Sequence, residues 1–218
     1  AGIGTNVTFI DRVDGFKKAI TVIDDAQAAI TANAISPSFL SSIPAGIDIG
    51  NTLNALKARY SLFAGLYPQA LAAANAVDIA KKSTFNFDAL SLNPIFEVST
   101  STNNVVQVKD STLGLLVPLQ PEPSDKRIPF YTTINATILP RFRINGFGNA
   151  AATAFPVYLP GEISLIKAEC YTRGASPDLV NGLQQLNNVI TKQPAADPFG
   201  VGAGLPTIVG VFTQAQLL

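Results

Sequence analysis

The sequence predicts a single, mainly helical domain over residues 1–218, in which helical hairpins flank an irregular, partly β excursion. Two observations carry this prediction. The segments at about 11–82 and 160–193 have apolar residues at helical spacing, a Gly at the turn, and a Pro near the start of the following helix. The stretch at about 94–155 is instead rich in Pro, Val and Thr, which is typical of loops and short strands.

The first hairpin region begins with an amphipathic stretch at residues 11–32. Phe16, Ile20 and Ile23 recur at helical spacing, and the charged side chains fall mostly on the other side. A connector rich in Pro, Ser and Gly is expected at residues 35–50.

Two further helices are expected on either side of a turn at Gly65. Asn51 or Thr52 is the expected N-cap of the first, which runs to that turn. A Pro inside a helix costs about 3 kcal/mol because it lacks a backbone donor, whereas at the first position of a helix it costs almost nothing. Pro68 is therefore expected to open a new helix that continues to about Lys82.

The excursion divides into three segments. Residues 94–110 alternate and are rich in Val and Thr, which predicts a strand or hairpin. Residues 117–133 contain four prolines and are expected to form an extended loop. Residues 140–157 contain an Asn-Gly turn signal and are also expected to be loop.

The second hairpin region repeats the device of the first. Residues 161–174 are expected to form a helix that ends at a glycine. In the next helix Ser176 is the expected cap and Pro177 the first residue, and Pro194 ends it. Thr213 is positioned to begin one more helix.

Two helix–turn–helix units with Gly at the turn are typical of a tetratricopeptide-like stack. Gly65, Tyr67 and Ala70 fall where that repeat places its turn glycine, an aromatic residue and a small packing residue. The units are not in tandem, because the long excursion separates them. Inserted loop regions of such length are usually functional.

Composition excludes several classes of function. Lys+Arg and Asp+Glu are 15 each, and this balance argues against binding to nucleic acid or to an anionic membrane surface. The chain has no His, which excludes a Ser-His-Asp triad and an HExxH metal site. Cys170 is the one cysteine, so it is expected to be a small buried residue and not part of a disulfide or zinc cluster. No cofactor is expected.

Paired carboxylates could indicate glycoside hydrolysis, which needs two of them across a cleft. Asp24 and Asp25 are adjacent on one helix, so their side chains diverge. Glu162 and Glu169 share roughly one helix face, but nothing in the pattern marks either as a catalytic group. We therefore do not expect an enzyme.

Residues 155–192 resemble the signature of the SusD/RagB family of nutrient-binding outer-membrane lipoproteins. The positions in register with that signature are Pro156, Tyr158, Glu162, Leu165, Ala168, Glu169 and Asn187. Further segments are similar to family segments in the same order, namely residues 16–30, 55–74, 93–99, 124–127 and 212–218.

The resemblance implies a SusD-like, lipid-anchored protein on the extracellular face of the outer membrane. Such a protein caps a SusC-like TonB-dependent transporter and captures oligosaccharides, or peptides in the RagB branch, for import without catalysis. The resemblance places the lipid-bearing cysteine in a leader that this chain lacks. The alternative interpretation of the same helices is a tetratricopeptide-like scaffold whose concave face holds a protein partner.

Sugar capture places aromatic rings against sugar faces, while amides and charged groups bind the hydroxyls. Rings and polar groups of this kind gather around the segment 141–147. The functional interpretation is a binding lip, and the alternative is a strand that packs Phe142 and Ile144 inward. The candidate ligand-binding residues are Tyr131, Arg141, Phe142, Arg143, Asn145 and Phe147.

Overall fold

A computed structural model of the chain describes residues 9–100, 107–110, 112–134 and 142–218. Within these ranges the protein is mainly helical with two small antiparallel sheets, so the mainly helical class is confirmed. The described elements are α1 Arg12–Ala32, α2 Pro37–Ser42, α3 Ile49–Phe63, α4 Tyr67–Asn75, β1 Thr84–Phe85, α5 Pro94–Ser99, η1 Val117–Leu119, α6 Arg127–Tyr131, β2 Thr132–Ile134, β3 Phe142–Ile144, η2 Gly146–Gly148, β4 Phe155–Pro156, α7 Pro160–Arg173, α8 Leu179–Ile190, η3 Pro194–Ala196 and α9 Gln214–Leu217.

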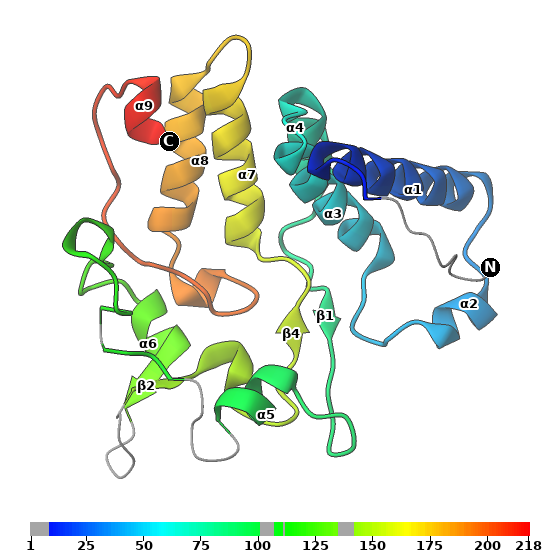
Figure 1. Ribbon diagram of the computed structural model, residues 1–218, viewed down its shortest axis with the longest axis horizontal. Helices are drawn as coiled ribbons and strands as arrows, with labels where there is room; N and C mark the ends of the chain where they lie inside the picture. Colours follow the sequence, from blue (N-terminus) through cyan, green and yellow to red (C-terminus); the bar gives the residue numbers. More distant parts are fainter. Residues whose placement is uncertain (1–8, 101–106, 111, 135–141) are drawn as a thin grey trace.

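Two pairs of helices, a covering helix and the excursion make up most of the described part of the molecule (Figure 1). Helices α7 and α8 pack as one pair and α3 and α4 as another, α4 contacts α7, and α1 covers α3. The strands β1 and β4 pair below these helices and lead into the excursion, drawn in green. The excursion therefore lies at one end of the helical pairs.

Helix α1 confirms the amphipathic helix expected at residues 11–32, and Asp11 caps it by accepting a hydrogen bond from the Val13 amide at 2.8 Å. The connector that follows contains the short helix α2. The expected cap of α3 is wrong by one turn: Asp48 is the N-cap and accepts from the Asn51 amide. Asn51 and Thr52 lie inside the helix, where their side chains bind a different segment.

The turn at Gly65 is confirmed. Gly65 has φ +73°, a left-handed conformation that favours glycine, and α4 begins at Tyr67 with Pro68 in its first turn. Helix α4 ends at Asn75, whereas the sequence predicted that it would continue to about Lys82. The chain beyond it folds back onto the start of α3.

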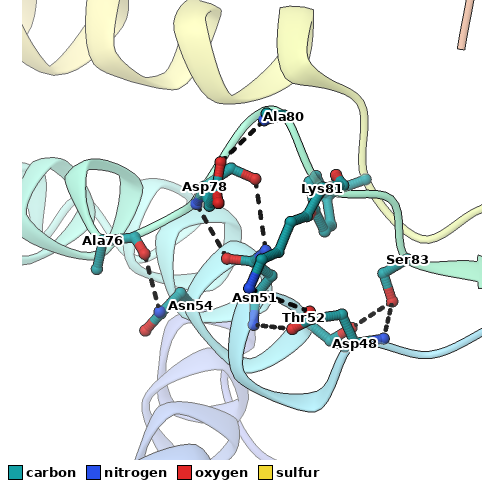
Figure 2. A network of polar contacts seen from close by, with 10 residues as sticks. Asp48, Asn51, Thr52, Asn54, Ala76, Asp78, Ala80, Lys81 and Ser83 are labelled. Atoms are coloured by element: carbon teal, nitrogen blue, oxygen red, sulfur yellow. Dashed lines mark hydrogen bonds and ion pairs between the residues drawn. The ribbon is translucent and has the colours of Figure 1, made fainter. Parts of the chain in front are cut away.

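Polar side chains of α3 hold this returning segment (Figure 2). The Asn51 amide oxygen accepts from the Asp78 backbone N–H at 2.9 Å, and its amide nitrogen donates to the Asp78 carbonyl at 3.4 Å. The Thr52 and Ser83 hydroxyls are 2.7 Å apart, and Asn54 donates to the Ala76 carbonyl. The bonds of Asn51 and Asn54 pair backbone groups of Asp78 and Ala76, which a longer α4 would have paired internally.

We expect Asn51→Ala to lower the free energy of unfolding by about 1 to 2 kcal/mol, because it removes two hydrogen bonds that the buried Asn51 side chain makes to the Asp78 backbone. Urea denaturation measures this change. Asn75→Ala is the matched control, since Asn75 is exposed on α4. Equal effects of the two variants would contradict the role assigned to Asn51.

The second hairpin consists of α7 and α8. Helix α7 ends at Gly174 as expected. The start of α8 differs from the expectation: Asp178, and not Ser176, caps it by accepting from the Asn181 amide, so Pro177 precedes the helix. Helix α8 also ends at Ile190, before Pro194, and Thr213 begins α9 through a capping box, as the sequence predicts.

The core lies between the two hairpins. Small residues of α3 and α4 pack against Tyr158 and the inner face of α7, which lets the helices approach closely. Cys170 is buried in this core, as expected, and burial followed by the charge of Glu169 raises the pKa of its thiol to about 11. The buried members are Ala55, Ala58, Ala70, Ala73, Ala74, Val77, Tyr158, Ile163, Ile166 and Cys170.

The excursion departs most from the expectations. Residues 94–99 form helix α5 and not a strand, and the Asn93 side chain caps that helix; residues 101–106 lie outside the described part. The Pro-rich segment is not wholly extended, because it contains η1 and α6. Strands β2 and β3 pair in antiparallel register, with Ile134 opposite Phe142, where a loop was expected at 142–144.

Candidate functional site

Five aromatic rings converge, four of them from the excursion and one from the C-terminal segment, and we call them the aromatic cluster: Phe130, Tyr131, Phe147, Phe155 and Phe199. The Phe147 ring is the centre, with ring centroids at 5.3 Å from Phe130, 6.2 Å from Tyr131, 6.1 Å from Phe155 and 5.9 Å from Phe199. All four pairs are edge-to-face, the arrangement that aromatic quadrupoles favour. The rings of the cluster therefore pack in defined orientations.

Helix α6 supplies two of the rings. Its start is held by Asp125, whose carboxylate accepts from the Arg127 backbone amide and from the guanidinium at 2.6 Å. Burial alone raises the pKa of Asp125, but the hydrogen bonds and charge of Arg127 together outweigh it and leave the pKa lowered. At the other end of α6, the backbone amide of Asn145 donates to the Tyr131 carbonyl at 2.8 Å.

Gly146 allows the close approach of η2 to α6. It has φ +57°, and a Cβ at this position would lie 2.7 Å from the Phe130 ring. Any other residue would therefore displace the ring as well as strain the backbone. The glycine of the Asn-Gly turn thus places Phe147 beside Phe130.

The C-terminal segment brings in Phe199. Asp197 is buried, and its carboxylate accepts from the amides of Phe199 at 2.9 Å and Val201 at 3.1 Å. The Lys126 amide donates to the Ala203 carbonyl, which attaches this loop to the residue before α6. Two segments that lie more than 70 positions apart in the sequence, at Lys126 and Ala203, thereby contribute to one site.

A pocket of about 590 Å³ opens on the Phe130, Phe147 and Phe199 rings, a size within the usual range for small-molecule sites. The Lys82 ammonium lies 5.4 Å from the centroid of Phe199, within reach of a cation–π contact. The amides and hydroxyls that line the same pocket belong to Thr84, Asn145, Asn149 and Thr153. The pocket thus combines ring faces with hydrogen-bonding groups.

Tyr131 lies at the junction of two neighbouring cavities, of about 410 and 440 Å³. Burial raises the pKa of its phenol; the charge of Arg127 lowers it and that of Asp197 raises it further. The phenol is therefore neutral at pH 7 and can both donate and accept a hydrogen bond.

The structure brings together three of the six candidate residues. Tyr131, Asn145 and Phe147 belong to or adjoin the aromatic cluster. Phe142 and Arg143 lie on β3, both half-buried, and Arg143 donates to the Thr100 carbonyl at 3.1 Å. Arg141 lies outside the described residues. The strand of the alternative interpretation is present, since Phe142–Ile144 is β3.

Sequence reasoning missed Lys82 and Phe199. Lys82 was expected to end a helix, and Phe199 fell in a glycine-rich tail with no assigned role. The Asp197-Pro198 pair before Phe199 is a turn signal, but nothing local indicates that this turn lies against α6.

The two glutamates considered for catalysis have cationic partners. Glu162 receives two hydrogen bonds from the Arg59 guanidinium, which also donates to the Val157 carbonyl. Glu169 pairs with Arg173 at 2.7 Å. The bond to Glu162 raises the pKa of Arg59, and this bidentate pair joins α3 of one hairpin to α7 of the other.

The fold and the site define a mainly helical protein with an aromatic-lined pocket between its excursion, the segment around β1 and the C-terminal segment. Comparison with protein-family models, curated proteins and solved structures found no match to the chain. Among the described residues, no helix has the length and apolar character needed to cross a bilayer.

Proposed function

We propose that the chain is a SusD-like, non-catalytic solute-capture protein that works at the extracellular face of the outer membrane with a SusC-like TonB-dependent transporter. In this proposal α3–α4 and α7–α8 are tetratricopeptide-like hairpins that form a rigid support, and the excursion between them carries the ligand site.

The observation that carries the proposal is the pocket beside the aromatic cluster. Its rings present flat apolar surface, and its Asn and Thr side chains supply donors and acceptors. This is the combination that an oligosaccharide needs, since a sugar ring has apolar faces and a hydroxylated edge. A peptide with polar and aromatic residues is the second ligand class that the same pocket fits.

The first test is capture of the full-length protein from detergent-solubilised outer membranes, with partners identified by mass spectrometry. We expect a TonB-dependent transporter to co-purify. Recovery in a soluble fraction with cytoplasmic partners would contradict the proposal and favour a protein-interaction scaffold.

The second test measures binding to oligosaccharides and peptides by calorimetry. We expect Phe199→Ala to weaken the affinity about tenfold, because it removes one stacking face. Phe142→Ala is the matched control, because Phe142 lies on β3 and does not line this pocket. If both variants bind as tightly as the unchanged chain, the aromatic cluster is not the ligand site.

A further inference from the structure

An exposed segment of the excursion, residues 112–120, is aliphatic and uncharged, and we call it the aliphatic loop. No charged residue lies between Asp110 and Glu122. The exposed fractions are 41% for Leu113, 40% for Leu115, 76% for Leu116, 81% for Val117 and 67% for Leu119. Large apolar side chains scattered singly on a surface are ordinary, but a contiguous group marks an interaction site.

The loop satisfies much of its own backbone. The Asp110 carboxylate accepts from the amides of Thr112 and Gly114, and the Leu115 amide donates to the Thr112 carbonyl at 3.1 Å. Further along the loop, the Leu119 amide donates to the Leu116 carbonyl at 2.8 Å. The Leu113 amide also donates to the Asp110 carbonyl, the Gln120 amide donates to the Val117 carbonyl, and the Gln120 side chain donates to the Leu115 carbonyl.

The turn at the start of the loop places a leucine where glycine or asparagine is usual. Leu113 has φ +59° and Gly114 has φ +67°, as the central residues of a type I′ turn require. A bulky residue in this conformation is an outlier that persists only when the structure or the function demands it. The residue that adopts this strained conformation here is an exposed leucine.

We propose that the aliphatic loop inserts shallowly into the hydrocarbon of a lipid bilayer. Hydrocarbon requires that backbone groups be paired internally, and this loop pairs many of its own. Protein hot spots favour Trp, Tyr and Arg, whereas Leu and Val are under-represented there. All five exposed side chains are Leu or Val.

The charged residues at the base of the loop are Lys109, Asp110 and Glu122. The stem of Lys109 lies against Gly114, and such a side chain can keep its ammonium at the headgroups while its methylenes cover apolar surface. The Asp110 carboxylate is directed into the loop by its bonds to Thr112 and Gly114. This inference goes beyond solute capture, because it requires neither a ligand nor a transporter.

The test is co-sedimentation of the chain with vesicles of phosphatidylcholine, alone and mixed with phosphatidylglycerol. We expect binding to both, and at least about tenfold weaker binding for Leu116→Glu. Leu90→Glu is the matched control, because Leu90 is 98% exposed outside the loop. Leu113→Asn should weaken vesicle binding while raising the melting temperature, since Asn tolerates a positive φ.

Three results would overturn the proposal. The first is an unchanged chain that does not sediment with either vesicle. The second is equal binding by the Leu116→Glu and Leu90→Glu variants. The third is a dimer in vesicle-free solution that Leu116→Glu dissociates, which would assign the loop to contact with a second copy of the chain.

Discussion

Asn93→Asp is expected to lower the free energy of unfolding by at least about 3 kcal/mol, since it removes two of the four hydrogen bonds that this buried side chain makes. The Asn93 side chain is fully buried. Its oxygen accepts from the amides of Ile95 and Phe96, and its nitrogen donates to the carbonyls of Phe147 and Thr153, both at 2.7 Å. A carboxylate keeps the helix cap but places an oxygen against two carbonyl oxygens.

Urea denaturation at several pH values measures this effect. Burial and the facing carbonyls raise the pKa of the introduced carboxyl group, so the deficit should shrink at acid pH, where the protonated group can donate one bond. Asn86→Asp is the control: Asn86 is exposed, and its oxygen accepts from the Thr84 hydroxyl, a bond that a carboxylate preserves. A deficit below about 1 kcal/mol would mean that Asn93 does not anchor α5 to the aromatic cluster.

Tyr158→Ala is expected to cost about 3 to 5 kcal/mol, because it empties a site in the core that is 1% exposed. Tyr158→Phe separates packing from polarity: it keeps the ring and removes the hydrogen bond to the Lys81 carbonyl at 3.0 Å, at a cost of about 1 kcal/mol. Thermal or urea unfolding of both variants measures the difference. Equal losses would contradict the packing role of the ring.

The raised pKa of the Tyr158 phenol also predicts that the protein loses folding stability at alkaline pH. Burial, with smaller contributions from the charges of Asp48 and Asp78, raises its pKa from 10.0 to about 12. The neutral form is therefore favoured in the folded state, so its contribution is complete below pH 10 and is lost as the pH rises toward 12. The stability advantage of the unchanged chain over Tyr158→Phe should decline across this interval. A constant difference from pH 8 to 12 would contradict the shifted pKa.

Much of the helical part of the fold was predictable because its signals are local. Apolar spacing places α1 and α7, and the Gly65 turn needs only the conformational freedom of one residue. The caps of α3 and α8 were misplaced, since several capping residues lie close together and the tertiary contacts choose among them. Asp48 caps α3 because Asn51 is engaged with Asp78.

The excursion shows why the rest could not be predicted. Its Val and Thr favour a strand at residues 94–99, but the helix there is capped by Asn93, whose amide is held by carbonyls at Phe147 and Thr153. The aromatic composition and the Asn-Gly turn indicated Tyr131, Asn145 and Phe147, which the structure places close together, and their role in binding a ligand stays a prediction.

The sequence by itself determined the helical class and the turn glycines, and it indicated two of the five rings, Tyr131 and Phe147, because periodicity and conformational preference act between near neighbours. Only the tertiary structure decided which rings meet and which groups surround them. Phe199 and Lys82 reach the pocket through backbone bonds between distant segments, such as that from Lys126 to Ala203. Buried backbone groups must find partners wherever the folded chain supplies them, and no local pattern encodes that choice.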